Sequence, residues 1–131
     1  MEIDAYKAKI GEVAKKHDLD TVVLFGSQAT GRTHAKSDID IAVSSRAKLN
    51  MPRIMLDLDE VFGRDDIEAV DLGKASPTLA LAIVKEGKVL YEKEQGSFFR
   101  WKIYAIKIWM ETAWLRQLRR KQLVGWAAAI S

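Results

Sequence analysis

The sequence predicts an α/β (α+β) protein in which a small mixed β-sheet is flanked by helices. Short runs of apolar, often β-branched residues are bounded by turn residues, which is typical of strands. Between them lie longer segments whose apolar residues recur every three or four positions, as they do on one face of a helix. A chain of 131 residues is long enough to form one domain with a sizeable core.

The first half of the chain predicts a helix, a strand, a turn and a second strand, in that order. Residues 3–17 carry apolar side chains at helical spacing. The uninterrupted apolar run at 21–25 predicts a buried strand, and Gly26-Ser27 directly after it predicts a turn or the start of a short helix. Residues 38–43 begin by alternating polar and apolar side chains, which predicts the next strand.

The second half predicts three helices and two strands. We expect helices at 51–62 and 77–86, because a proline suits the first turn of each and a glycine follows the end of the second. Residues 67–72 predict a strand, and the alternating residues 88–92 predict a short edge strand. Residues 97–124 predict one long C-terminal helix.

Charge and tryptophan are distributed unevenly along the chain. Residues 1–95 hold 14 Lys and Arg against 17 Asp and Glu, whereas residues 96–131 hold 7 basic residues and one acid, Glu111. The net charge of +3 therefore combines a slightly acidic first part with a strongly basic tail, and all four tryptophans lie in that tail. This shift predicts a boundary near residue 95, with a first domain at 1–95 and a helical tail at 96–131 that packs on it.

Apolar residues cover more than one narrow face of the expected C-terminal helix. One stripe consists of Phe99, Ile103, Ile106, Met110 and Ala113, and a second consists of Trp101, Ile108, Leu115 and Leu118. Either the helix packs across the first domain, or one stripe meets a partner chain with Trp101, Trp109 and Trp114 as anchors. The basic residues between 116 and 121 leave contact with nucleic acid as a further alternative.

The composition bears on the cellular compartment in which we expect the protein. The sequence has no cysteine, so we expect neither disulfides nor a zinc–thiolate site, which is compatible with a reducing cytoplasm. Its first residues include acids and lack the apolar stretch of a signal peptide, so we do not expect them to form one. It contains no run of about 18 apolar residues, so we expect no membrane-spanning helix and a cytoplasmic protein.

The most informative local pattern is Gly26-Ser27 followed, after ten residues, by Asp38 and Asp40. Successive side chains of a strand point to opposite faces, so Asp38 and Asp40 share one face. Two carboxylates so placed repel each other unless a cation lies between them, and oxygen ligands of this kind select Mg²⁺ or Mn²⁺. Gly26 lets the backbone approach a phosphate because it has no Cβ, and Ser27 lies where a helix would start. The pattern predicts a site for a nucleoside triphosphate and its metal ions.

This pattern resembles the signature of the DNA polymerase beta superfamily of nucleotidyltransferases. It is most similar to the minimal nucleotidyltransferase family, which includes antitoxins that are paired with HEPN-domain toxins. The residues that carry the resemblance are Leu24-Phe25-Gly26-Ser27-Gln28-Ala29-Thr30-Gly31-Arg32, Ser37-Asp38-Ile39-Asp40-Ile41-Ala42-Val43, Ile67-Glu68-Ala69-Val70-Asp71-Leu72, Ala75-Ser76-Pro77 and the segment 83–92. Together they span about residues 20–93, and they imply a polymerase-beta-like fold.

The resemblance implies an enzyme that transfers a nucleoside monophosphate from a triphosphate to a hydroxyl, with Mg²⁺ or Mn²⁺ as cofactor. By likeness to the antitoxins, the donor is ATP and the acceptor is a tyrosine of a partner HEPN toxin, which adenylylation would silence. The alternatives are modification of a small molecule or a nucleic acid, or a catalytically silent module that only binds a toxin. Whether the chain forms a homo-oligomer or a hetero-oligomer stays open.

The family places a third carboxylate on the strand after Asp38 and Asp40, and two residues of this sequence compete for the role. Glu68 and Asp71 lie three positions apart, so they point to opposite faces of a strand, and only one is expected to reach the metals. We favour Glu68, although relatives usually carry an Asp there. Arg32 also departs from the family pattern, because relatives often place an arginine before the glycine that corresponds to Gly31. We expect Arg32 either to contact a triphosphate oxygen or to be solvated.

Overall fold

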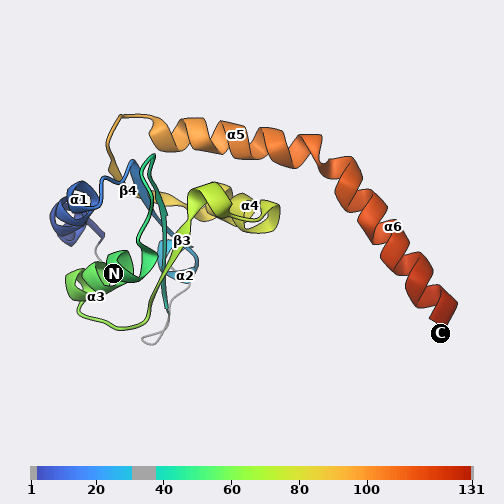
Figure 1. Ribbon diagram of the computed structural model, residues 1–131, viewed down its shortest axis with the longest axis horizontal. Helices are drawn as coiled ribbons and strands as arrows, with labels where there is room; N and C mark the ends of the chain where they lie inside the picture. Colours follow the sequence, from blue (N-terminus) through green and yellow to red (C-terminus); the bar gives the residue numbers. More distant parts are fainter. Residues whose placement is uncertain (1–2, 31–37, 131) are drawn as a thin grey trace.

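The computed structural model describes residues 3–30 and 38–130. Within these residues the chain forms one four-stranded sheet in the order β3-β2-β1-β4, with helices on both faces (Figure 1). The strands are β1 (Thr21–Phe25), β2 (Ile39–Ser44), β3 (Ile67–Asp71) and β4 (Lys88–Glu92). β1 pairs antiparallel with both β2 and β4, whereas β2 pairs parallel with β3. The predicted small mixed sheet flanked by helices is therefore confirmed.

The helices follow the predicted order, with two differences in extent. They are η1 (Ile3–Ala5), α1 (Lys7–Lys16), α2 (Ser27–Thr30), α3 (Met51–Phe62), η2 (Leu72–Lys74), α4 (Pro77–Glu86), α5 (Ser97–Glu111) and α6 (Ala113–Ile130). The helix expected at 3–17 is divided into the short 3₁₀ helix η1 and α1. The single helix expected at 97–124 is also divided, and its second part continues to residue 130.

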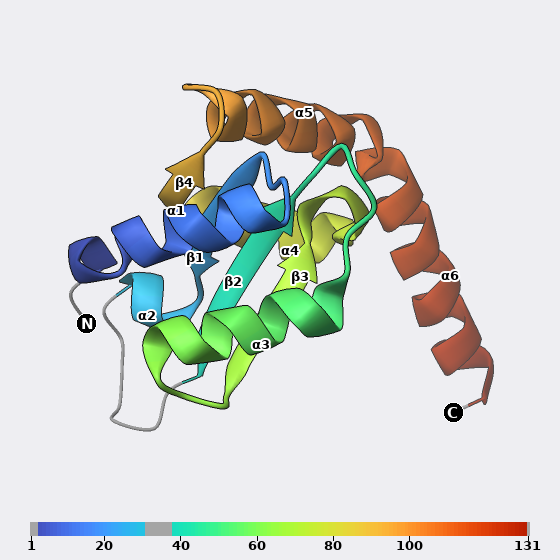
Figure 2. The same cartoon turned by 60° about the vertical axis from the view of Figure 1, so that its left-hand side comes forward.

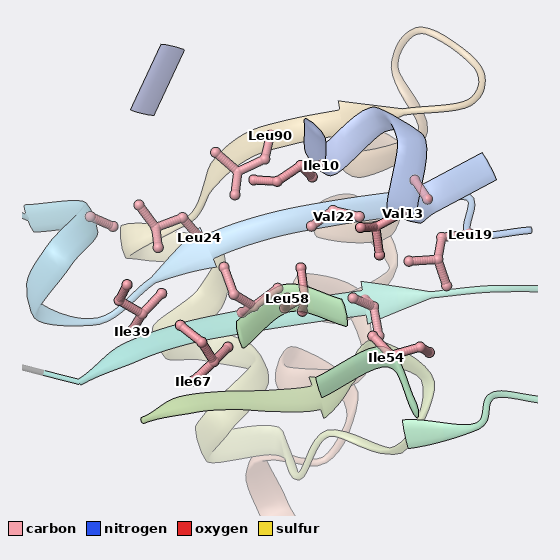
Figure 3. Close-up of a cluster of buried hydrophobic side chains, with 14 residues drawn as sticks. Ile10, Val13, Leu19, Val22, Leu24, Ile39, Ile54, Leu58, Ile67 and Leu90 are labelled. Carbon is pink, nitrogen blue, oxygen red and sulfur yellow. The ribbon is translucent and has the colours of Figure 1, made fainter. Parts of the chain in front are cut away.

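The sheet separates two hydrophobic clusters. On one face, Ile10 of α1 and Ile54 and Leu58 of α3 pack against alternate residues of the strands (Figure 3). On the other face, Ile83 of α4 and Phe98 of α5 pack against the remaining strand residues. Figure 2 shows α1 and α3 in front of the sheet and α4 behind it. The central strand β1 is buried along its whole length, because both of its faces are covered.

Local signals in the sequence explain where α3 and α4 begin. The side chain of Asn50 accepts a hydrogen bond from the N–H of Arg53, 3.3 Å away, and caps α3. Ser76 does the same for α4 by accepting from the N–H of Leu79 at 3.2 Å. In both helices a proline occupies the first turn, where its missing N–H costs no hydrogen bond.

Gly87 ends α4 for a different reason from the one that the sequence predicts. A glycine after a helix usually adopts a left-handed conformation, but Gly87 is extended, with φ −65° and ψ 135°. A Cβ at this position would lie 2.5 Å from the carbonyl oxygen of Ile83, 2.8 Å from the ring of Phe98 and 2.9 Å from the side chain of Val23. Gly87 is therefore needed because α4, α5 and β1 approach one another closely at this point.

The C-terminal segment is two helices because Thr112 interrupts it. The carbonyl of Ile108 accepts both the Thr112 hydroxyl at 2.7 Å and the Thr112 N–H at 3.0 Å, and side-chain bonds of this kind often bend helices. The guanidinium of Arg116 then donates to Thr112 Oγ1 at 2.8 Å and to the carbonyl oxygen of Trp109 at 2.7 Å. It also lies over the Trp109 ring, 3.4 Å from its centroid. Arg116 thus satisfies the end of α5 while the chain changes direction.

The two helices of this segment differ in how they contact the rest of the protein. α5 packs against α4 and β4, and the Phe98 ring stacks on Trp101 with centroids 5.7 Å apart. α6 instead extends away from the sheet (Figure 1), and none of its residues 113–130 is buried. Among the described residues, no helix is both long enough and apolar enough to cross a membrane.

We predict that Gly87→Ala lowers the free energy of unfolding by about 2–3 kcal/mol, because the added methyl group overpacks the junction of α4, α5 and β1. The measurement is urea unfolding followed by circular dichroism. Gly125→Ala is the matched control: Gly125 lies in α6 with nothing within 4 Å of an added Cβ, so helix propensity predicts an unchanged or slightly higher stability. Equal stability of the Gly87→Ala variant and the wild type would contradict the close packing.

Candidate active site

The loop after β1 depends on the backbone of Gly26. The antiparallel register places Phe25 opposite Asp40, so Gly26 follows directly beside the start of β2. Gly26 has φ +78°, which side-chain-bearing residues rarely adopt, and an added Cβ would collide with the carboxylate of Asp40. Its carbonyl oxygen accepts from the N–H groups of Ala29 and Thr30 and so begins α2. Glycine is needed here both for conformation and for space.

Three of the predicted acidic residues lie near this loop, and two of them, Asp40 and Glu68, share one face of the sheet. Asp38 directly precedes β2 and is exposed, and Asp40 is a half-buried residue of β2. The parallel register pairs Asp40 with Glu68 of β3, so the Glu68 side chain points to the same face as Asp40. The next residues of that face, Ala42 and Val70, belong to the cluster covered by α4 and α5. The acidic group therefore lies on the α4 side, at the edge of the core.

Asp40 is the electrostatic centre of this group. Burial raises the pKa of its carboxyl above the usual 3.8, and the negative charges of Glu68, Asp38 and Glu86 raise it further. The ionised form is thus destabilised by a low-dielectric surrounding and by like charges. A cation bound between these oxygens would favour the ionised form and so offset the rise in pKa.

Asp71 has a different position from the other predicted acids. It pairs with Val43 at the end of β3 and therefore faces away from Asp40 and Glu68. Its carboxylate accepts the N–H of Gly73 at 2.8 Å and caps η2. This geometry favours Glu68 over Asp71 as the third acid of the site and gives Asp71 a structural role.

Ser27 and Arg32 are the two residues that the sequence predicts to contact phosphate. Ser27 is the first residue of α2, directly after Gly26, as the sequence predicts. Arg32 lies in the segment 31–37, which is outside the described residues. The predicted phosphate contacts of Ser27 and Arg32 both stay predictions.

Glu86 is a member of the acidic group that sequence reasoning missed. It is the last residue of α4, and its carboxylate oxygen Oε2 accepts the N–H of Gly26 at 3.2 Å. A signal was present in the sequence: an acid in the last turn of a helix interacts unfavourably with the helix dipole. Its distance of 60 residues from Gly26 hid the contact.

The donor chemistry of the site fits a hard divalent cation. In the ranges 3–30 and 38–130, no group of three or more Asp, Glu or His side chains lies close enough together to hold a metal ion as it stands. The acids on this face nevertheless offer only carboxylate oxygens, which suit Mg²⁺ or Mn²⁺. The raised pKa of Asp40 is the expected property of a carboxylate in such a group before a cation neutralises it.

The model of the family described as "Polymerase beta, Nucleotidyltransferase" matches residues 8–96, which contain the whole sheet and every acid of the site. The chain belongs to the polymerase beta nucleotidyltransferase family. This membership confirms the resemblance that the Gly26 and Asp38–Asp40 patterns indicate.

Two relatives of this nucleotidyltransferase are proteins named protein adenylyltransferase MntA. The one from Aphanizomenon flos-aquae is 36% identical over 95 residues, which cover 61% of this chain and 61% of the relative. The one from Shewanella oneidensis is 36% identical over 91 residues, which cover 68% of this chain and 63% of the relative. The matches therefore span less than two thirds of the length of either relative.

A solved structure extends the similarity to most of the nucleotidyltransferase chain. A chain of a toxin–antitoxin crystal structure with AMP-PNP is similar with a TM-score of 0.77 and 27% sequence identity. The similarity covers 90% of this chain and 98% of the other. It thus includes part of the C-terminal helical segment, which lies outside the family match at 8–96.

We predict that Glu68→Gln lowers the rate of nucleotide transfer at least about 100-fold, because a lost carboxylate removes charge neutralisation in the transition state. Asp71→Asn should keep the rate within a few-fold, and Asp71→Ala should do the same while lowering the free energy of unfolding by about 1 kcal/mol, since only alanine removes the oxygen that caps η2. Transfer from radiolabelled ATP and urea unfolding separate the two effects. If Asp71→Asn abolishes transfer and Glu68→Gln does not, Asp71 is the third acid.

Proposed function

We propose that this chain is a Mg²⁺- or Mn²⁺-dependent protein adenylyltransferase. It transfers AMP from ATP to a hydroxyl, a tyrosine of a cognate HEPN-family toxin, and thereby acts as the antitoxin. One observation carries the proposal: Asp40 and Glu68 share a face of the sheet directly beside Gly26, and the charge of Asp38 lies close enough to raise the pKa of Asp40. A phosphate-accepting loop beside a group of carboxylates is what transfer from a nucleoside triphosphate requires.

The similar proteins support ATP as the nucleotide donor and a toxin as the partner. The two relatives at 36% identity are named protein adenylyltransferases. The similar solved chain comes from a toxin–antitoxin structure with AMP-PNP, an ATP analogue. We infer the same donor and the same kind of partner for this chain. The absence of cysteine and the lack of a membrane-crossing helix among the described residues agree with action in the cytoplasm.

Each residue of the site has a physical part in the proposed reaction. Because Gly26 has no Cβ, the Asp40 carboxylate can lie directly against the loop that would receive the phosphate. Asp38, Asp40 and Glu68 would hold the divalent cations, which when bound neutralise phosphate charge and lower the pKa of an attacking hydroxyl. Asp40 lies at the centre of this group, half-buried between the loop and β3. The protein contributes position and charge rather than covalent chemistry.

We predict that Asp38→Asn and Asp40→Asn abolish transfer of AMP while the fold persists, because both acids lie at the edge of the core rather than within it. The measurement is transfer of labelled AMP from ATP to the co-purified toxin, with the fold checked by circular dichroism. Glu60→Gln, at an exposed position on α3, is the matched control and should transfer at the wild-type rate. Full activity of the double Asp38→Asn, Asp40→Asn variant would refute the proposed site.

We further propose that α6 forms part of the partner surface. Trp114 and Trp126 are 61% and 65% exposed, and apolar residues of this size normally mark an interaction site when they are exposed together. The anchors expected from the sequence are only partly suitable. Trp101 is half-buried against Phe98, and Trp109 is covered by Arg116. Trp114 is the exposed one of the three.

Nucleic acid is the second candidate acceptor or ligand, and one observation favours it. Arg119, Arg120 and Lys121 form an exposed basic cluster on α6. The fourth basic candidate from the sequence, Arg116, is already engaged with Thr112 and Trp109. An interaction of this kind would weaken steeply with salt.

We predict that deletion of residues 118–131, which keeps Arg116 and its contacts with Thr112 and Trp109, leaves the free energy of unfolding within about 0.5 kcal/mol of wild type, because α6 buries no residue, and weakens binding of a co-expressed toxin. Urea unfolding and pull-down of the tagged toxin are the two measurements, and Trp114→Ala tests a single anchor. A large loss of stability would show that α6 is part of the core. Loss of salt-dependent RNA binding instead of toxin binding would favour the nucleic-acid alternative.

A further inference from the structure

Glu86 connects α4 to the loop that begins at Gly26. Its half-buried carboxylate accepts the Gly26 N–H at 3.2 Å, although the two residues are 60 positions apart. Within α4 this placement is unfavourable, because a negative charge at the C-terminal end opposes the helix dipole. The hydrogen bond to Gly26 is a compensating interaction outside the helix.

Gly26 is held on several sides, and Glu86 supplies one of these contacts. The carbonyl oxygen of Gly26 accepts from Ala29 and Thr30 and so fixes the start of α2. The carboxylate of Asp40 fills the space that a side chain would take. Glu86 holds the N–H, the remaining polar group of the Gly26 backbone. The loop conformation at φ +78° is therefore stabilised from β2 and from α4 together.

The position of Glu86 is itself tightly constrained. The next residue, Gly87, has no room for a Cβ between the carbonyl of Ile83, the ring of Phe98 and the side chain of Val23. Phe98 is buried and belongs to the first turn of α5. The end of α4 cannot shift without moving β1 or α5, so the backbone of Glu86 is held at a fixed place beside the loop, within reach of the Gly26 N–H.

We propose that Glu86 is a positioning residue of the nucleotide site: its carboxylate oxygen anchors the Gly26 N–H and so holds the phosphate-binding loop against Asp40. This inference rests on the proposed function. It differs from a role as a metal ligand or a general base, because anchoring requires a hydrogen-bond acceptor of the correct length and does not require a negative charge. Glutamine retains that acceptor, whereas methionine retains only the approximate length and shape.

The test compares Glu86→Gln, Glu86→Met and Glu86→Ala in the full chain. We expect kcat/KM for ATP to fall about 10- to 100-fold in the Met and Ala variants, since small displacements of positioning groups have effects of this size. Glu86→Gln should stay within about threefold of wild type. Amide hydrogen exchange at Gly26, followed by NMR, should accelerate in the Met and Ala variants and stay slow in the Gln variant. Lys85→Ala, an exposed neighbour on α4, is the matched control and should change neither quantity.

Each other result overturns the proposal. If Glu86→Gln is as damaging as Glu86→Ala, the charge acts directly on a metal or a proton. If the Met or Ala variant transfers faster than wild type, Glu86 competes with the phosphate for the loop. If Gly26 exchange is unchanged in the Met variant, the hydrogen bond is not the anchor. Absence of transfer by the wild-type chain would refute the proposed function, and the exchange measurement would still decide the anchoring.

Discussion

The parallel register between β2 and β3 is the constraint on which the site depends. By pairing Asp40 with Glu68, it places two carboxylates side by side on one face of the sheet, next to the loop at Gly26. Burial and the neighbouring negative charges raise the pKa of Asp40, so the ionised form of this acidic group is destabilised without a cation. A shift of one residue in this register would move Glu68 to the opposite face and disperse the acids. The fold therefore fixes the electrostatics of the site.

The same face of the sheet links the site to the C-terminal helices. α4 covers the cluster behind Asp40, and its end is locked by the contact of Gly87 with Phe98 of α5. α5 is thus part of the support of the site, although it lies outside the family match at 8–96. α6 begins after the interruption at Thr112 and contributes no buried residue. The basic tail therefore contains a structural helix followed by an exposed one.

Local sequence patterns predicted most of the fold, and the failures have physical reasons. Strand periodicity and the prolines of the first helical turns predicted the sheet and the starts of α3 and α4, because those signals act within a few residues. The interruption at Thr112 was missed, since it depends on a side chain bonding back to Ile108 in an otherwise continuous helical pattern. Within the site, strand alternation predicted one face for Asp38 and Asp40; Asp40 lies in β2, and Asp38 directly precedes it. Glu86 was missed because only tertiary packing brings it to Gly26.

The central claim is that the acids beside Gly26 bind the metal–nucleotide complex. Paramagnetic line broadening by Mn²⁺ in the presence of ATP tests it directly, in NMR spectra of the uniformly labelled chain. Our account predicts broadening that is centred on the amides of Gly26, Asp40 and Glu68 and leaves the amides of α3 sharp. Broadening centred on the acidic surface of α3, around Asp57 and Glu60, would contradict it.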